Sequence, residues 1–169
     1  FHVRDIPVYG DLILAPMDGF SDLPFRRICR ENGSAMSYTE FVNVDEFKGG
    51  RWPEKTGRKL VFDASERPMT FQVYGNDEDR LVAVAEWLLE LRPSLLDLNM
   101  GCSVNTIAGR GAGAGLLCTP AKIGAIFRRL SATLPIPVTG KIRLGWDDRS
   151  RNYLDVARIL EDSGAALIA

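Results

Sequence analysis

The stretch of sequence that decides the fold is MTFQVYGNDEDRLVAVAEWLLELRPSLLDLNMGC, residues 69–102. Its first five residues, 69–73, form an apolar run that stops before Gly75-Asn76 and predicts a buried strand. Residues 77–91 have the spacing of a helix with one apolar face. The residues on that face are Leu81, Val84, Ala85, Leu88 and Leu89. A second apolar run at 95–99 predicts another strand, so the stretch is a strand–helix–strand unit typical of a parallel sheet.

The alternation of strand and helix continues on both sides of this unit. The other expected strands are residues 12–15, 35–38, 136–142 and 165–169, and the other expected helices are residues 23–31, 120–130 and 150–162. Ser21-Asp22 and Thr119 are the expected N-caps of the first two of these helices. Residues 43–68 are polar and mixed, and they predict a long connection with room for one short helix. The sequence therefore predicts an α/β fold.

Candidate functional side chains follow the ends of five successive predicted strands. They are Met17-Asp18, Thr39-Glu40, Gln72, Asn99 to Cys102, and Lys141 to Arg143. An open doubly wound sheet would concentrate such residues at one switch point, whereas a TIM (β/α)8 barrel gathers all strand ends on one face. We therefore expect a TIM barrel. Because a full barrel needs at least about 200 residues, residues 1–169 are expected to be the N-terminal part of a barrel truncated after about five and a half β/α units.

Composition and charge exclude several classes of function. The formal net charge is -1 and the apolar fraction is 46%, which is typical of a soluble globular domain without a broad basic surface for nucleic acid. Cys29, Cys102 and Cys118 are too few and too scattered for a disulfide framework or a zinc site, and His2 is the only histidine. No metal site is therefore expected. No signal peptide or membrane span is recognisable, so we expect a cytoplasmic protein with reduced thiols.

Cys102 is the first candidate for chemistry. It follows the predicted strand 95–99, and Gly101 allows the sharp backbone turn that would place the thiol at the mouth of a barrel. There it could act as a nucleophile or as a proton donor. The alternative is a free cysteine that serves as a small buried apolar residue. Asn99 at the same strand end suits the edge of a uracil or a flavin, although an Asn that caps the loop is the simpler interpretation.

Lys141 and Arg143 are the second group of candidates. Because they are two residues apart on a predicted strand, their side chains point to the same side. Two cations inside a barrel need an anionic or electron-rich partner, such as a flavin, whereas two surface cations at a strand end need none. Gln72 is a buried amide whose partners could be flavin ring atoms or backbone groups. The glycines of residues 109–115 do not fit a dinucleotide fingerprint, and they predict a close-packed loop.

Five motifs, taken in order, resemble those of tRNA-dihydrouridine synthases. They are APMDGFSD at 15–22 with Phe25-Arg26, YTE at 38–40, QVYG at 72–75, DLNMGC at 97–102 with GAGA at 111–114, and VTGKIRLG at 138–145. The motifs are collinear and span residues 12–146. The resemblance implies an FMN-binding barrel that uses NADPH to reduce uridine to 5,6-dihydrouridine in tRNA, with the uridine flipped out of the RNA.

The resemblance also implies roles for individual residues. Cys102 would protonate C5 of the uracil while the flavin delivers hydride to C6, which suits a thiol, since an ordinary thiol is protonated at neutral pH. Asn99 and Arg143 would contact the substrate. The residues expected at the flavin are Pro16, Met17, Asp18, Gln72 and Lys141.

The sequence departs from the family in two places. Ser103 stands where the family usually has proline, and Asn105-Thr106 occupies a region where a basic residue is frequent. The flavin phosphate site and the helical tRNA-binding domain of the family are expected to be absent from residues 1–169. Two alternatives are an FMN-barrel reductase of a free pyrimidine, similar to dihydroorotate dehydrogenases, and a non-catalytic fragment that self-associates through unpaired strand edges. The start at Ala15 to Gly19 argues against the first.

Overall fold

A curved parallel sheet forms the centre of the computed structural model, which describes all residues, 1–169. Its strands are β3 (Ser37–Tyr38), β4 (Val42–Asn43), β5 (Met69–Tyr74), β6 (Leu95–Asn99), β7 (Val138–Lys141) and β8 (Leu167–Ile168). The order in the sheet is β3-β5-β6-β7-β8, with β4 also paired to β5, and every pair is parallel. Because the order in space follows the order in sequence, the sheet has the topology of part of a TIM barrel, and the predicted fold class is confirmed.

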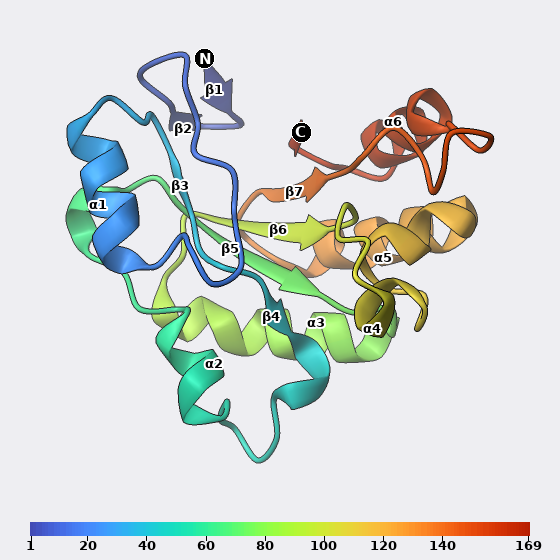
Figure 1. Ribbon diagram of the computed structural model, residues 1–169, viewed down its shortest axis with the longest axis horizontal. Coiled ribbons are helices and arrows are strands. Elements are labelled where there is room, and N and C mark those ends of the chain that lie inside the picture. The colour runs from blue at the N-terminus through green and yellow to red at the C-terminus, as the bar shows by residue number, and fades with distance from the viewer.

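Helices connect the strands and cover one face of the sheet (Figure 1). They are α1 (Leu23–Glu31), α2 (Glu54–Arg58), α3 (Glu78–Leu88), α4 (Asn105–Ala108), α5 (Pro120–Thr133) and α6 (Tyr153–Asp162). Short 3-10 turns are η1 (Val44–Glu46), η2 (Ala64–Glu66), η3 (Leu89–Leu91) and η4 (Gly113–Cys118). The predicted helices at 23–31, 77–91, 120–130 and 150–162 are confirmed to within a few residues. None of the helices combines the length and the apolar character that crossing a membrane requires.

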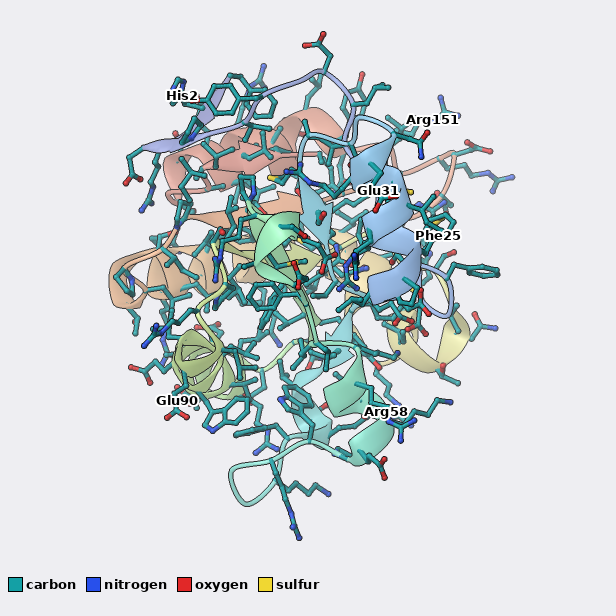
Figure 2. All side chains as sticks on the ribbon, turned by 90° about the vertical axis from the view of Figure 1, so that its left-hand side faces the viewer. His2, Phe25, Glu31, Arg58, Glu90 and Arg151 are labelled. Atoms are coloured by element: carbon teal, nitrogen blue, oxygen red, sulfur yellow. The ribbon has the colours of Figure 1, made fainter.

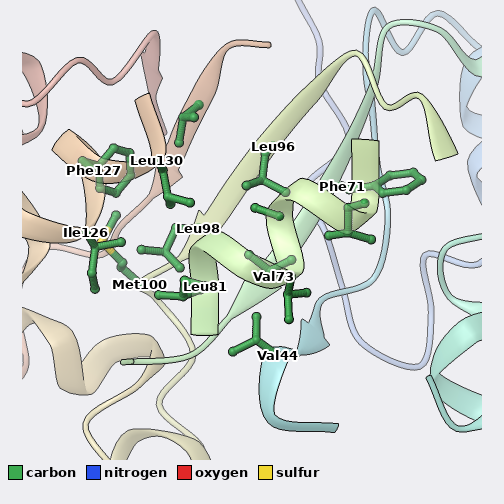
Figure 3. Packing of buried hydrophobic residues seen from close by; sticks show 14 of the residues in the cluster. Val44, Phe71, Val73, Leu81, Leu96, Leu98, Met100, Ile126, Phe127 and Leu130 are labelled. Atoms are coloured by element: carbon green, nitrogen blue, oxygen red, sulfur yellow. The ribbon is translucent and has the colours of Figure 1, made fainter. Parts of the chain in front are cut away.

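The main core lies between the outer face of the sheet and helices α3, α5 and α6. Alternate strand residues point outward into it, among them Phe71 and Val73 of β5 and Leu96 and Leu98 of β6 (Figure 3). The helices contribute Leu81, Leu88, Ile123, Ile126, Phe127, Leu130, Val156 and Leu160, all of them at most 1% exposed. The outer face therefore supplies the apolar burial that stabilises the fold, which leaves the residues of the inner face available for polar contacts.

A small hairpin covers the beginning of the inner face. Strands β1 (His2–Val3) and β2 (Ile6–Pro7) pair antiparallel at the N-terminus. Val3, which is completely buried, packs in a second cluster with Tyr38 of β3 and Leu95 at the start of β6. The hairpin lies beside this part of the sheet in Figure 1. The hairpin could not be predicted from the sequence, because its strands are only two residues long and carry no recognisable period.

The prediction of a buried strand at residues 12–15 is wrong. The structure assigns no strand there, and Leu12 is 73% exposed and Ile13 36% exposed. The segment runs beside the residues that precede β3, where Ala35 N–H donates to Leu12 O at 2.7 Å and Leu14 N–H donates to the Ser34 hydroxyl at 3.2 Å. An apolar run becomes a buried strand only when neighbours cover it, and this run has backbone contact on one edge only.

The long connection between β3 and β5 is held by a buried ion pair. Arg26 of α1, 1% exposed, donates to the Glu66 carboxylate at 2.7 Å and also to the Ser21 and Val61 carbonyls. Its neighbour Phe25 points out of the same helix and is 40% exposed (Figure 2). The pair joins α1 to η2, so the connection 43–68 is more structured than the one short helix expected from its sequence.

Candidate active site

The inner face of the sheet carries a row of buried polar side chains. The strand register places Gln72 of β5 opposite Asp97 of β6, and Asp97 opposite Thr139 of β7. Residues two positions further along the strands, Asn99 and Lys141, are also opposite each other. Because alternate residues share a face, all five side chains point to the inner side of the curved sheet. Most barrel interiors hold branched apolar residues at such positions, so the polar row marks this part of the sheet as a candidate site.

Asp97 is the centre of the row, and the sequence analysis did not single it out. It is 1% exposed and accepts two hydrogen bonds, one from Gln72 Nε2 at 2.7 Å and one from the Thr139 hydroxyl at 2.6 Å. Burial raises the pKa of Asp97 to about 6, although the hydrogen bonds from Thr139 and Gln72 and the charge of Lys141 favour its ionised form. Burial, followed by the charge of Asp97, raises the pKa of Tyr38. The feature of the sequence that could have identified Asp97 is its position as a carboxyl group inside the apolar run 95–99.

Two amides link Asp97 to the loop that carries Cys102. Gln72, which is completely buried, accepts at Oε1 from Asn99 Nδ2 at 3.0 Å. Asn99 Oδ1 accepts in turn from the backbone N–H groups of Gly101 at 3.1 Å and Cys102 at 3.0 Å. Asn99 therefore caps the loop, as the simpler interpretation of this residue expected. The partners of the Gln72 amide are the side chains of Asp97 and Asn99, and not the flavin or backbone groups expected from the sequence.

Cys102 is half-buried at the carboxyl end of β6. Its carbonyl accepts from Ala114 N–H at 2.9 Å, so the glycine-rich segment packs directly against it. Gly113 has φ +54°, and a Cβ there would lie 2.7 Å from Cys102 O. The close approach requires glycine at this position. Of the predicted close-packed loop at 109–115, residues 112–115 are buried, but residues 109 and 110 are exposed and residues 113–115 begin the 3-10 turn η4. Cys29 and Cys118 are free thiols elsewhere in the chain.

The loop of Pro16, Met17 and Asp18 lies near the same end of the sheet. Ser21 Oγ accepts from Met17 N–H at 2.8 Å, and Glu40 accepts from Gly19 N–H at 2.6 Å. The Asp18 carboxylate forms an ion pair with Lys59. Burial and then the charges of Glu46, Asp18 and Cys102 raise the pKa of the Tyr74 hydroxyl at the end of β5.

The two predicted cations differ in their surroundings. Lys141 is half-buried on the inner face, where its charge favours the ionised form of Asp97. Arg143 is exposed and lines a surface hollow together with Trp146, Asp148 and Arg151. The structure therefore places Lys141 with the polar row and Arg143 on the loop that follows β7.

The donor set at the inner face fits a flavin ring better than a metal. Gln72 and Asn99 each use one of the two N–H donors of their amide, and Lys141 adds a cationic donor beside them. Met17 is 38% exposed and offers apolar surface at the same end of the sheet. A cation and amides beside an apolar side chain suit a heterocycle that gains negative charge on reduction. No three His, Cys, Asp or Glu side chains gather closely enough to hold a metal ion.

Comparisons with known proteins find a family that matches most of the chain. The family described as Dihydrouridine synthase (Dus) matches residues 13–169. The tRNA-dihydrouridine synthase B of Pseudomonas aeruginosa is 36% identical over 159 residues, which cover 94% of this chain and 47% of that protein. The Probable tRNA-dihydrouridine synthase 1 of Synechocystis is 33% identical over 167 residues, which cover 98% of this chain and 46% of that protein. The chain spans about half the length of these curated relatives.

Proposed function

The chain belongs to the dihydrouridine synthase family, and from that premise we propose that it forms the N-terminal part of an FMN-binding catalytic barrel that reduces uridine in tRNA to 5,6-dihydrouridine with NADPH. Both relatives described above carry the name of tRNA-dihydrouridine synthases. The motifs at 15–22 and 97–102, which resemble that family, lie at the same end of the sheet in the structure. In this proposal the remaining barrel strands and a helical tRNA-binding domain lie outside residues 1–169, and the enzyme acts in the cytoplasm.

The position of Cys102 is the observation that carries the proposal. Its thiol follows the carboxyl end of β6, and Asn99 and Ala114 hold the backbone on both sides of it. We assign to Cys102 the transfer of a proton from Sγ to C5 of the uracil. The second N–H of Asn99 holds the uracil edge, and Arg143 contacts the substrate from the loop after β7. FMN, when bound, supplies the hydride for C6.

The remaining candidates form the flavin contacts in this proposal. Lys141 donates from the inner face and stabilises negative charge on the ring. Met17 and Pro16 provide apolar contact, and Asp18 keeps its loop in place through Lys59. Gln72 accepts from Asn99 Nδ2 and thereby orients the Asn99 amide at the edge of the flavin site. These roles require the side chains to contact one flavin, so measurements of flavin binding can test them.

Flavin binding is the first test of the proposal. FMN is titrated into the 169-residue chain while quenching of flavin fluorescence is followed, with Lys141→Ala as the test variant and Lys55→Ala, an exposed lysine of α2, as the matched control. We expect saturable binding that Lys141→Ala weakens and Lys55→Ala does not. The titration is repeated on a fusion of residues 1–169 with the C-terminal half of the Pseudomonas aeruginosa relative. Absence of binding to both proteins would contradict the flavin site.

Turnover tests the role of Cys102. The fusion protein is incubated with FMN, NADPH and unmodified tRNA, and dihydrouridine is quantified by mass spectrometry of the nucleosides. Loss of a general acid lowers a rate by about 100-fold or more, so Cys102→Ala should lower kcat by that factor, while Cys118→Ala should leave kcat unchanged. Reduction of free pyrimidines in place of tRNA would favour the dihydroorotate-dehydrogenase-like alternative.

Self-association is a second candidate property of residues 1–169 on their own. Leu12 is 73% exposed, and the segment around it is hydrogen-bonded on one edge only. Exposed apolar surface of this kind favours association with another chain. Sedimentation velocity over a range of protein concentrations distinguishes a monomer from a self-associating fragment without turnover, and a Leu12→Lys variant should shift the population toward the monomer.

A further inference from the structure

The hydrogen-bonded row on the inner face has a fixed direction. At one end is the Asp97 carboxylate, which only accepts hydrogen bonds when it is ionised, and at the other end are the backbone N–H groups of Gly101 and Cys102, which only donate. Between them lie two amides, each with one accepting and one donating side. The row therefore starts from an acceptor and finishes on donors, and both amides must be oriented to match.

Only one orientation of each amide satisfies both ends. Gln72 must turn Nε2 toward Asp97, as it does at 2.7 Å, and this leaves Oε1 facing Asn99. Asn99 must then present Nδ2 to Gln72, at 3.0 Å, and Oδ1 to the loop. Reversal of either amide would set two donors or two acceptors against each other inside a site in which Gln72 is 0% and Asn99 7% exposed. Unsatisfied buried groups of that kind are costly.

The other groups around Asp97 support the same direction. The Thr139 hydroxyl donates to Asp97 Oδ1 at 2.6 Å, which leaves Oδ2 to accept from Gln72. Lys141 favours the ionised, accepting form of Asp97. The pKa of about 6 leaves the carboxyl group mostly ionised at neutral pH. The acceptor at the beginning of the row is therefore present under ordinary conditions.

We propose that Asp97 is a positioning residue for Cys102, which it orients through the side-chain amides of Gln72 and Asn99. Asp97 is connected to the backbone of Cys102 through the hydrogen bonds of these two amides. It determines which way both amides face, and thereby whether Asn99 can accept from the backbone of Cys102. The catalytic meaning of this inference rests on the proposed function, in which Cys102 is the proton donor.

Hydrogen exchange of single backbone amides tests the proposal without flavin or tRNA. The exchange rates of the Gly101 and Cys102 N–H groups are measured by NMR in the 169-residue chain. Asp97→Val removes the acceptor, and loss of the ordered hydrogen bonds should make both groups exchange about tenfold faster. Asp97→Asn keeps an oxygen for Gln72 and can donate to Thr139, so it should retain the slow exchange.

Thr70→Val is the matched control. Thr70 is buried on β5, two residues before Gln72 on the same face, and its hydroxyl has no hydrogen-bond partner. Its replacement disturbs the inner face without touching the row, so the exchange at Gly101 and Cys102 should not change. If Asp97→Val does not fold, Gln72→Met interrupts the row at its second member and should give the same local acceleration.

Two results would overturn the proposal. One is unchanged exchange at Gly101 and Cys102 in Asp97→Val or in Gln72→Met. The other is an equal acceleration along the whole of α5, which would indicate general destabilisation. Failure of the proposed function would be recognised separately. It would appear as unchanged dihydrouridine formation by the Cys102→Ala fusion protein, whatever the exchange rates are.

Discussion

At the scale of single residues, the inner face holds a carboxyl group whose ionisation opposes folding. Burial raises the pKa of Asp97 from 3.8 to about 6. Because its pKa is higher in the folded state, the protonated Asp97 carboxyl group contributes to the free energy of unfolding. This contribution is fully present below about pH 4 and is lost as the pH rises through about 6. Asp97 therefore costs stability at neutral pH, although its carboxylate organises the hydrogen bonds around it.

An Asp97→Asn variant should reveal this cost. The amide does not titrate, so the free energy of unfolding of the variant should lack the pH dependence that Asp97 causes. Relative to Asp97→Asn, the wild type should lose on the order of 3 kcal/mol between about pH 4 and pH 7, from 1.36 kcal/mol per pKa unit. Urea unfolding of both proteins at several pH values measures the difference. A difference between the two proteins that stays constant with pH would contradict the shifted pKa.

The sequence identified most members of the site but not their connections. Cys102, Asn99, Gln72 and Lys141 could be predicted as candidates, because each lies at or near the end of a recognisable strand. Asp97 could not, because its partners Gln72 and Thr139 are 25 and 42 residues away along the chain. Their meeting depends on the register between strands, which no local pattern of residues encodes. The assignments of substrate and flavin contacts remain predictions.

At the scale of elements, two helix starts that look equivalent in sequence differ in the structure. Asp77 accepts from Arg80 N–H at 2.8 Å and caps α3. Thr119 precedes α5, but its hydroxyl donates to Leu116 O at 3.2 Å and does not cap the helix, contrary to expectation. The Thr119 hydroxyl is unavailable to cap the helix, because it donates to a carbonyl of the preceding turn η4. The local sequence correctly places Thr119 directly before α5, but the neighbouring turn determines the hydrogen-bond partner of its hydroxyl.

The two helix starts should therefore respond differently to substitution. Asp77→Ala removes a side-chain cap and should lower the free energy of unfolding by about 1 kcal/mol. Thr119→Ala removes no cap and should cost clearly less. Urea unfolding of both variants gives the comparison, with helix content followed by circular dichroism. Equal losses in the two variants would mean that the Thr119 hydroxyl supports α5 in another way.

The central strands agree most closely with the predicted runs, whereas the edge strands β3 and β8 are shorter than predicted. The runs at 69–73 and 95–99 became β5 and β6, which are each paired on both sides. The apolar run at 12–15 has similar composition but only one neighbouring segment, and it remains exposed. Apolar composition therefore predicts a tendency to be buried, and the surrounding elements decide whether the burial takes place.

At the scale of the whole molecule, the N-terminal hairpin closes one end of the inner face. Val3 is completely buried against Leu95 and Tyr38, although it is only the third residue of the sequence. Val3→Ala should lower the free energy of unfolding by about 2 kcal/mol, since it removes buried methyl groups and leaves a cavity. Tyr9→Ala, at a side chain that is 85% exposed, is the control and should have little effect. Equal effects in urea unfolding would show that the hairpin is not docked.

The order of the strands has a consequence for folding during synthesis. Strands β5, β6, β7 and β8 are neighbours in the sheet in the order in which the ribosome releases them. Each new strand can therefore pair with an edge that already exists, after closure of a single β/α loop. The hairpin is the exception, because it packs near Leu95 and Leu167, which are made long after it. The residues of the hairpin therefore complete their packing only after β8 has been made, although they precede all the strands of the sheet in the sequence.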